Sequence, residues 1–389
     1  MGKFKKLVSI DFSQSIGFFY QHVTQFLGFK PIEDEYKVMG LAPYTNTKNA
    51  RRVYKILKRF FKIDKEKNSW KMTISEYHLW HELPRLIGYR RFDHIASALQ
   101  TITEEILTEW VENAIKKFKI ANIICSGGVF ANIKVNLKIA KLKSVKYAYF
   151  MPSPGDETNA IGAAFYSYFQ KTQTAPKPLT HLYLGPSFAT EDIKKTLSKV
   201  IGKFKIEKPK DINLVAAILL AKGNVVARFA GRMEFGARAL GNRSILASPK
   251  DPSVVEFINS AVKNRDFWMP FAPTILAVHA KDYLIAHKAN SPYMNVAFET
   301  KALAKQDLTA AIHPYDKTTR PQILEKNTNP QYYDLVKKFE RLSGIGALLN
   351  TSFNLHGEPI VCSPQDAIRV FVKSDLKYLI LEDWLISKK

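Results

Sequence analysis

The stretch that most constrains this chain is an apolar run that leads directly into a loop rich in glycine and arginine. Residues 224–230 (NVVARFA) have the composition of a buried strand, and residues 231–244 (GRMEFGARALGNRS) follow them. The loop holds three arginines, three glycines and one glutamate. A strand that ends in such a loop brings planar guanidinium groups close to exposed backbone N–H groups. The pattern indicates a site for phosphate or carboxylate, although a basic surface loop with glycine turns has a similar composition.

The composition predicts a globular protein with room for two domains. The chain has 389 residues, of which 46% are hydrophobic and 12% aromatic. Its two cysteines cannot form a disulfide framework, and no paired-cysteine motif indicates zinc. The basic start is followed by an apolar stretch that Asp11 interrupts, so we expect no signal peptide. No apolar run approaches the roughly 18 residues of a membrane span, and we expect a cytoplasmic protein.

The charge balance is strongly basic. A net charge of +23 comes from 58 Lys and Arg against 35 Asp and Glu. This excess is compatible with a nucleic acid, an anionic membrane or a polyanionic substrate as partner. The lysines are scattered through many short stretches, however, which is equally typical of solvated surfaces. We therefore do not expect specific binding of nucleic acid.

The first 170 residues predict alternating strands and helices. We expect a strand over residues 7–12, a helix over 17–28 and one long amphipathic helix over 92–118. A buried strand over residues 120–125 then ends in Ser126-Gly127-Gly128, and a helix follows. Glycines at such a junction let the backbone approach a ligand, and a helix N-terminus favours negative charge. A tight turn without a ligand uses the same residues.

Two charged residues in this first half are candidates for binding. Lys37 lies in residues 35–44 (EYKVMGLAPY), which otherwise look buried, and it is either a solvated loop charge or a phosphate partner. Asp156 follows a strand predicted over residues 147–150 and begins a helix of small residues. Its carboxylate fits an N-cap, and it also fits a metal ligand at the mouth of a nucleotide cleft.

Residues 171–180 (KTQTAPKPLT) predict a linker, because they are polar, contain two prolines and lack apolar periodicity. We therefore expect one domain over residues 1–170 and a second over residues 181–389. Near the end of the second, residues 346–354 (GALLNTSFN) predict a strand whose apolar run changes abruptly to amides and hydroxyls. Such side chains at a strand end either close a turn or line a site.

Taken together, six motifs resemble the NodU/CmcH family of carbamoyltransferases. They span nearly the whole chain in the family's order, and the arginine-rich loop and the NTSFN motif are highly specific. The motifs are residues 35–44, 126–132 (SGGVFAN), 154–164 (PGDETNAIGAA), 231–246, 270–273 (PFAP) and 350–361 (NTSFNLHGEPIV). The resemblance implies an α/β protein with a partial actin-like ATPase (ASKHA) domain, followed by a YrdC-like domain on a twisted mixed sheet.

The resemblance also implies a reaction. In such enzymes the second domain makes carbamoyl-adenylate from carbamoyl phosphate and ATP, with Mg²⁺ as a companion of ATP. The first domain, with an iron-type divalent metal, passes the carbamoyl group to a hydroxyl of a glycan or natural product. Arginine side chains suit this chemistry because they neutralise phosphate and the charge that develops at an acyl centre.

Matching the motifs residue by residue assigns roles to side chains of this chain. Arg238, Arg320 and Asn350 are the expected contacts to carbamoyl phosphate and the adenylate, and Asp156 is the expected metal ligand. The residues expected to hold the nucleotide are Lys37, Gly127, Gly128, Asn132, Arg232, Arg243 and Ser352.

Two departures from the family shape the functional expectation. The family normally carries a long segment ahead of residue 1, with a His-x-x-x-His pair that completes the metal site, and Met269 stands where the family has arginine. We therefore expect an O-carbamoyltransferase that works with a second polypeptide supplying that segment. The alternatives are a catalytically degenerate nucleotide-binding or regulatory subunit and a basic RNA-associated carbamoylation factor.

Overall fold

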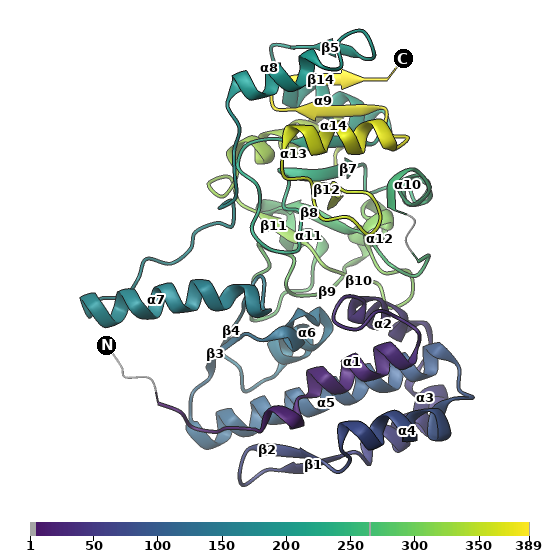
Figure 1. The fold of residues 1–389 in the computed structure, drawn as a ribbon, viewed down its shortest axis with the longest axis vertical. Coiled ribbons are helices and arrows are strands. Elements are labelled where there is room, and N and C mark those ends of the chain that lie inside the picture. Colours follow the sequence, from purple (N-terminus) through teal and green to yellow (C-terminus); the bar gives the residue numbers. More distant parts are fainter. Residues whose placement is uncertain (1–4, 264–265, 389) are drawn as a thin grey trace. The chain divides into compact units, whose positions relative to one another are not determined.

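The computed structural model describes residues 5–263 and 266–388, which divide into two compact units (Figure 1). The first unit comprises residues 1–177 with 287–290, and the second comprises residues 178–286 with 291–389. Helices and strands mix in both units, which confirms the expected α/β class. The division falls within the stretch predicted as a linker, although residues 171 and 172 still belong to a helix.

The first unit is built around the long helix α5 (Phe92–Phe118), which has the bounds that the apolar spacing predicts. Ile95, Leu99, Ile102 and Ile106 recur at helical spacing and are buried. Helices α1, α2, α3 and α6 pack against α5. The other helices of this unit are α1 (Ile16–Phe26), α2 (Glu35–Leu41), α3 (Thr47–Lys58), α4 (Glu76–Ile87), α6 (Ile133–Lys141) and α7 (Asn159–Thr172). A hairpin of β1 (Phe61–Asp64) and β2 (Ser69–Met72) completes this part.

Apart from the β1–β2 hairpin, the first unit contains a sheet of two parallel strands, β3 (Asn122–Cys125) and β4 (Tyr147–Phe150). The bounds of β4 agree with the prediction, but the expected burial of β3 is wrong, because Ile124 in its middle is 78% exposed. On the far side of β4, the N–H of Ala148 donates to the carbonyl of Lys288 at 3.0 Å. In the described part of the chain, no strand pairs with the outer edge of β3.

The strand expected over residues 7–12 is also wrong. Residues 7–11 form no helix or strand, and a 3₁₀ turn begins at Phe12. The carboxylate of Asp11 accepts the N–H of Ser13 at 3.0 Å and so caps this turn. A strand-like sequence becomes a strand only where a neighbouring strand accepts its hydrogen bonds, and no described strand forms a β-ladder with these residues.

The second unit is organised on an eight-stranded mixed sheet, in the order β11-β8-β12-β7-β6-β13-β14-β5. Among the described strands of this sheet, the pairs β11–β8 and β13–β6 are parallel and the other neighbouring pairs are antiparallel. Its strands are β5 (Lys205–Glu207), β6 (Val226–Phe229), β7 (Arg243–Ala247), β8 (Ala272–Leu276), β11 (Gln322–Leu324), β12 (Ala347–Ser352), β13 (Tyr378–Leu381) and β14 (Trp384–Ser387). A separate antiparallel pair is formed by β9 (Phe298–Glu299) and β10 (Thr318–Thr319). The large mixed sheet confirms the coarse architecture expected for this half.

Helices cover both faces of this sheet. Alternate residues of β6, Ala227 and Phe229, belong to an apolar core shared with α8, α10 and α14. Arg228 lies between them and points to the other face, where its guanidinium is 5.6 Å from the ring of Tyr332 on α13. Helices α9 and α13 pack together on that second face. The helices are α8 (Thr190–Ser198), α9 (Ile212–Ala221), α10 (Ser253–Ile258), α11 (Ala280–Tyr283), α12 (Ala302–Asp307), α13 (Pro330–Ser343) and α14 (Pro364–Lys373).

None of the helices in the described part of the chain combines the length and the apolar character that crossing a bilayer requires.

Candidate functional site

The loop between β6 and β7 is folded around one buried carboxylate. Oε1 of Glu234 accepts the backbone N–H groups of Leu240 at 2.8 Å, Asn242 at 2.7 Å and Arg243 at 3.2 Å. These bonds hold residues 240–243, at the end of the loop, against Glu234 near its beginning. Glu234 therefore gives the arginine-rich loop a fixed shape, a role that the sequence pattern alone does not assign to it.

Two buried arginines fasten this loop to the sheet. Arg243 is fully buried and donates to the carbonyls of Ala230 at 3.0 Å and Gly231 at 3.1 Å. Its guanidinium lies 3.6 Å from the centre of the Phe229 ring, and burial lowers its pKa to about 10. Arg228 donates to the carbonyl of Gly241 at 2.6 Å. The only signal for Arg228 in the sequence is its position inside an apolar strand.

The two arginines that flank the predicted site residue Arg238 make contacts within the protein. Arg232 is exposed and donates to the carbonyls of Leu184 at 2.7 Å and Gly185 at 3.1 Å. Arg243 donates to the backbone carbonyls named above. Contact of Arg232 or Arg243 with a ligand stays a prediction, whereas Arg238 is a partly exposed residue of the same loop.

The segments that carry Arg238, Arg320 and Asn350 converge beneath the loop. Nδ2 of Asn350, on β12, donates to the carbonyl of Ala239 at 3.2 Å, one residue after Arg238. It also lies 3.4 Å from Oε1 of Gln322 on β11, two residues after Arg320. The fold thus brings together three stretches that are far apart in the chain. It places two guanidinium-bearing segments beside one buried amide, an arrangement that suits an anion with hydrogen-bonding groups.

A buried polar network surrounds Asn350. Thr274 Oγ1 on β8 donates to Gln322 Oε1 at 2.8 Å and accepts from the hydroxyl of Tyr332 at 2.9 Å. The hydroxyl of Tyr183 donates to the carbonyl of Leu240 at 2.8 Å. Burial raises the pKa of both tyrosines, so their hydroxyls remain donors. Nothing in the sequence singles out these residues, because a lone Thr, Gln or Tyr in an apolar stretch is typical of any core.

Ser352 is the last residue of β12, and Met269 lies in the segment that leads into the neighbouring strand β8. Ser352 closes β12 opposite Ser244 of β7, and its hydroxyl donates to Oδ1 of Asn354 at 2.7 Å. Met269 precedes β8, and its N–H donates to the carbonyl of Asp266 at 3.0 Å. A thioether carries no charge, so Met269 brings no cation to this strand end. A nucleotide contact for Ser352 stays a prediction.

In the first unit, the two loops of the expected nucleotide site lie side by side. Gly127 has a φ of +111° and donates its N–H to the carbonyl of Pro154 at 2.8 Å. This bond joins the turn after β3 to the turn after β4. A Cβ on Gly127 or Gly128 would meet no heavy atom within 4 Å, so the surface beside both glycines is open.

Asn132 and Lys37 have partners within the first unit. Oδ1 of Asn132 accepts the N–H of Val135 at 3.1 Å, which makes it the N-cap of α6, and its amide exchanges hydrogen bonds with Gln100. Nζ of Lys37 lies 3.3 Å from Oδ1 of Asp34 in a mostly buried pair. Nucleotide contacts for both residues stay predictions.

Asp156 is exposed at the start of a 3₁₀ turn, Asp156–Thr158, that leads into α7. The N-cap of this turn is Gly155, so the N-cap interpretation of Asp156 is wrong. In the described ranges, no group of three or more His, Cys, Asp or Glu side chains is placed to hold a metal ion.

Comparison with known proteins connects both units to one enzyme family. Residues 2–165 match the family described as the carbamoyltransferase N-terminus, and residues 217–388 match the family described as the carbamoyltransferase C-terminus. An uncharacterised protein of Methanocaldococcus jannaschii is 37% identical over 386 residues, which cover 96% of this chain and 62% of that protein.

Two further relatives cover almost all of this chain. An uncharacterised protein of Synechocystis sp. is 32% identical over 422 residues, 97% of this chain and 68% of that protein. Nodulation protein NolO of Bradyrhizobium diazoefficiens is 32% identical over 396 residues, 99% of this chain and 71% of that protein. The chain spans less than two thirds of the length of the M. jannaschii relative. Since matches to one family cover most of both units, the chain belongs to the carbamoyltransferase family.

Proposed function

We propose that this protein is an O-carbamoyltransferase whose second unit makes carbamoyl-adenylate from carbamoyl phosphate and ATP. The observation that carries this proposal is the convergence of the segments of Arg238, Arg320 and Asn350 beneath a loop that Glu234 holds in shape. In this proposal the second unit is a YrdC-like domain, and the first is part of an actin-like ATPase domain. Family membership supports both assignments.

The proposed reaction balances as a hydrolysis followed by an adenylation. Water releases inorganic phosphate from carbamoyl phosphate and leaves carbamate. A carbamate oxygen then attacks the α-phosphorus of ATP, and pyrophosphate leaves. Arg238 and Arg320 are the residues proposed to bind the phosphate oxygens, because guanidinium groups match their geometry and offset their charge. Finally, a hydroxyl oxygen of a small molecule or glycan attacks the carbamoyl carbon, the bond from that carbon to the adenylate oxygen breaks, AMP leaves and the hydroxyl loses its proton.

The described residues do not fit the iron-type metal that the family resemblance implies. Asp156 is exposed, and no cluster of suitable ligands includes it among residues 5–263 and 266–388. One carboxylate is too few for a transition metal. The proposed reaction therefore includes no step on that metal, and Mg²⁺ takes part only as the ion bound to ATP.

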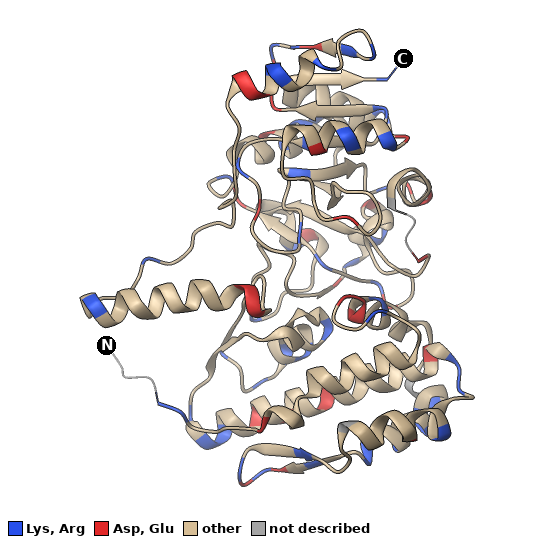
Figure 2. Ribbon diagram, in the orientation of Figure 1, with Lys and Arg blue, Asp and Glu red and all other residues tan. Residues whose placement is uncertain are grey.

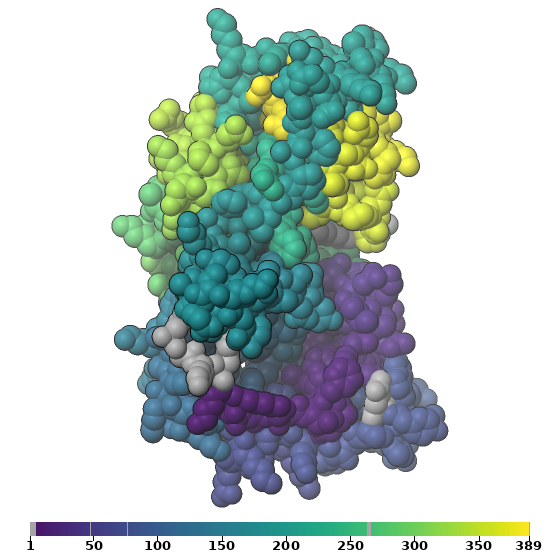
Figure 3. Space-filling view, turned by 60° about the vertical axis from the view of Figure 1, so that its left-hand side comes forward, coloured from purple at the N-terminus to yellow at the C-terminus, as the bar shows by residue number. Residues whose placement is uncertain are grey.

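An exposed apolar region of the first unit supports a role for a second polypeptide. Helix α7 has fourteen residues, of which one is charged and none is buried. It stands out from the surface of its unit (Figures 2 and 3), and the acidic residues Asp156 and Glu157 lie in the turn before it. Ile124 on the neighbouring β3 is 78% exposed. Parallel strands are normally covered on both faces, so we propose that a polypeptide segment adds a strand to β3 and covers this region.

The test of this function is release of pyrophosphate. The purified chain, alone and mixed with the N-terminal segment of a full-length relative, is incubated with ATP and carbamoyl phosphate. We expect pyrophosphate only when both substrates are present, and transfer to a hydroxyl acceptor only when the added segment is present. No pyrophosphate under either condition would contradict the proposed reaction.

Met269 favours a second candidate function, a nucleotide-binding subunit without turnover. An uncharged side chain ahead of β8, where the family has arginine, lowers the positive charge available to a phosphate. In this case ATP or carbamoyl phosphate binds, but no mixture gives product. The variant Met269→Arg separates the two candidates, because a degenerate subunit has other defects and stays inactive, whereas a weakened enzyme gains turnover.

A further inference from the structure

Helix α3 of the first unit carries exposed cations along one side. Its buried residues, Ala50, Val53 and Leu57, recur at helical spacing, and the helix packs against α5. The hydroxyl of Tyr54 also donates to Oε2 of Glu105 on α5 at 2.7 Å, which fixes the orientation of α3. The opposite side of the helix is basic, and the cations exposed there are Lys48, Arg51, Arg52, Lys55 and Arg59.

The spacing of these cations places them on a single face. Arg52 lies four residues after Lys48, and Lys55 lies three residues after Arg52. Arg59 follows four residues later, so all are neighbours along one side of the helix. Lys58 pairs with a carboxylate on α5, but none of the exposed cations has an ion pair within the described part of the chain. Like charges at these intervals destabilise a helix.

The β1–β2 hairpin adds two more cations beside the end of α3. Lys62 on β1 is directly opposite Lys71 on β2, and both side chains are exposed without an ion pair to any described residue. Like charges at directly opposed positions destabilise a pair of strands. The hairpin adjoins α3, because the hydroxyl of Thr73 donates to the carbonyl of Arg59 at 2.9 Å and its N–H donates to the carbonyl of Phe60 at 2.8 Å.

These seven exposed residues of α3 and the hairpin are called the basic face. They belong to a segment, residues 46–75, that contains ten Lys and Arg against two Asp and Glu. Both the face of α3 and the opposed lysines lower stability in the free protein. Surface features that oppose stability in this way are expected at functional sites, and here the missing group is an anion.

A surface of anionic lipid suits the basic face better than nucleic acid does. Proteins that read single-stranded nucleic acid add exposed aromatic rings that stack on bases. In this segment Phe60, Phe61 and Trp70 are buried. Anionic headgroups require only cations, and about four to eight Lys and Arg on an amphipathic helix are typical of proteins that bind them.

We propose that the basic face holds the protein against a bilayer rich in anionic phospholipid. The contact is one of charge without insertion, because the apolar side of α3 packs against α5. It therefore weakens as the salt concentration rises. This inference goes beyond the proposed function and does not depend on carbamoyl transfer, since it concerns only exposed residues of the first unit.

The test measures binding of the full chain to vesicles by sedimentation. We expect binding to vesicles of phosphatidylcholine mixed with phosphatidylglycerol and none to phosphatidylcholine alone. Replacing Arg51, Arg52 and Lys55 together by Gln should weaken binding about 100-fold, since each cation near an anionic surface contributes roughly a factor of five. Lys71→Gln alone should weaken it about 5-fold without lowering the free energy of unfolding, because the repulsion with Lys62 is also removed.

The matched control removes the same charge from the second unit. Lys194, Lys195 and Lys199 are exposed on and beside α8, and replacing them by Gln should change binding by less than about 2-fold. Equal weakening by the two triple variants would overturn the inference, because the net charge of +23 would then explain the attraction. Equal binding to both kinds of vesicle would also overturn it, as would binding of an RNA duplex without binding to the mixed vesicles. Lys71→Gln decides the outcome if the triple variant does not fold.

Discussion

Gly241 lies against the ring of Tyr332 so closely that an added Cβ would come within 2.2 Å of the ring's Cδ1. Gly241 also has a φ of +112°, a conformation that other residues rarely adopt. Its carbonyl accepts from Arg228, and its N–H donates to the hydroxyl of Ser244 at 3.0 Å. A glycine is therefore required here both by the backbone and by the packing of α13 on the loop.

Gly241→Ala is expected to lower the free energy of unfolding by about 2–4 kcal/mol, because backbone strain and a steric clash add together. The measurement is denaturant unfolding of the full chain. Gly344→Ala is the matched control, since Gly344 has a φ of +76° but nothing within 4 Å of the added Cβ. The control should lose only the strain, about 1 kcal/mol. Equal losses in the two variants would show that contact with Tyr332 does not matter.

Glu234→Gln is expected to destabilise the second unit by about 2–4 kcal/mol, because buried arginines lose a nearby negative charge. The amide keeps one acceptor for the N–H groups of Leu240 and Asn242, so the loss reports mainly on the charge. Thermal or denaturant unfolding measures it. Glu256→Gln, an exposed site on α10, should change stability by less than about 0.5 kcal/mol. The hypothesis fails if the two substitutions cost the same.

Periodicity and motif order predict much of this fold, because strong local signals coincide with tertiary packing. The long helix α5, strand β4 and the strand before the arginine-rich loop lie where the spacing of apolar residues predicts them. The predictions fail for residues 7–12 and for the burial of β3. Both depend on neighbouring strands, and the identity of a neighbour is not encoded in a local pattern.

The candidate site was predictable only in part, for a similar reason. Arginine and asparagine stand out in Gly/Arg and NTSFN motifs, so Arg238 and Asn350 can be found from the sequence. Thr274, Gln322 and Tyr332 come from three separate segments and acquire meaning only where the sheet and α13 bring them together. Arg243 is the opposite case, because the motif makes it conspicuous although its role in the structure is to hold the loop. Its fully buried guanidinium donates to backbone carbonyls.

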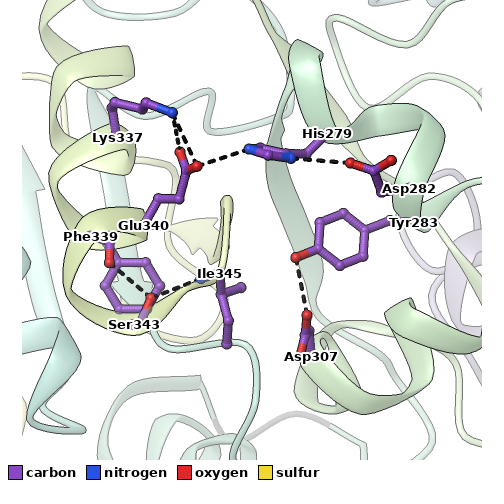
Figure 4. A network of polar contacts seen from close by, with 9 residues as sticks. All are labelled: His279, Asp282, Tyr283, Asp307, Lys337, Phe339, Glu340, Ser343 and Ile345. Atoms are coloured by element: carbon purple, nitrogen blue, oxygen red, sulfur yellow. Dashed lines mark hydrogen bonds and ion pairs between the residues drawn. The ribbon is translucent and has the colours of Figure 1, made fainter.

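An ion-pair network on the second unit predicts a dependence of stability on pH (Figure 4). The carboxylate of Glu340 on α13 lies 2.9 Å from Nε2 of His279 and 2.8 Å from Nζ of Lys337. Burial alone would raise the pKa of Glu340, but hydrogen bonds from Lys337 and His279 hold this pKa below its ordinary value. A carboxyl group with a lowered folded-state pKa contributes stability above its unfolded pKa and loses it as the pH falls through the folded value.

Glu340→Gln is therefore expected to cost on the order of 1 kcal/mol at pH 7, and the difference from wild type should vanish below about pH 4. Unfolding curves between neutral and acidic pH measure this difference. Glu325→Gln, at an exposed position, is the control and should track the wild type throughout. A cost that persists unchanged in acid would show that the carboxylate acts by packing and not by charge.

Arg320→Lys tests the proposed anion site. Lysine keeps the positive charge but loses the planar pair of donors, so we expect carbamoyl phosphate to bind about 10- to 100-fold more weakly. Calorimetry measures the dissociation constant, and an unfolding curve confirms that the fold is intact. Arg341→Lys, on the exposed side of α13, should leave the affinity unchanged. An unaltered dissociation constant in Arg320→Lys would remove this residue from the site.

Ile124 tests whether a second polypeptide covers β3. Its side chain is 78% exposed, so Ile124→Lys should change the stability of the isolated chain by less than about 0.5 kcal/mol. If a strand joins the outer edge of β3, the same substitution buries a charge in the new interface. Association with the N-terminal segment of a full-length relative should then weaken by at least about 10-fold. Sedimentation or calorimetry measures the association.

Tyr89→Lys is the control, because it places the same charge at a fully exposed aromatic residue away from β3 and should leave the association intact. Equal effects at the two positions would argue for a nonspecific response to charge, because only Ile124 belongs to the strand whose outer edge is open among the described residues.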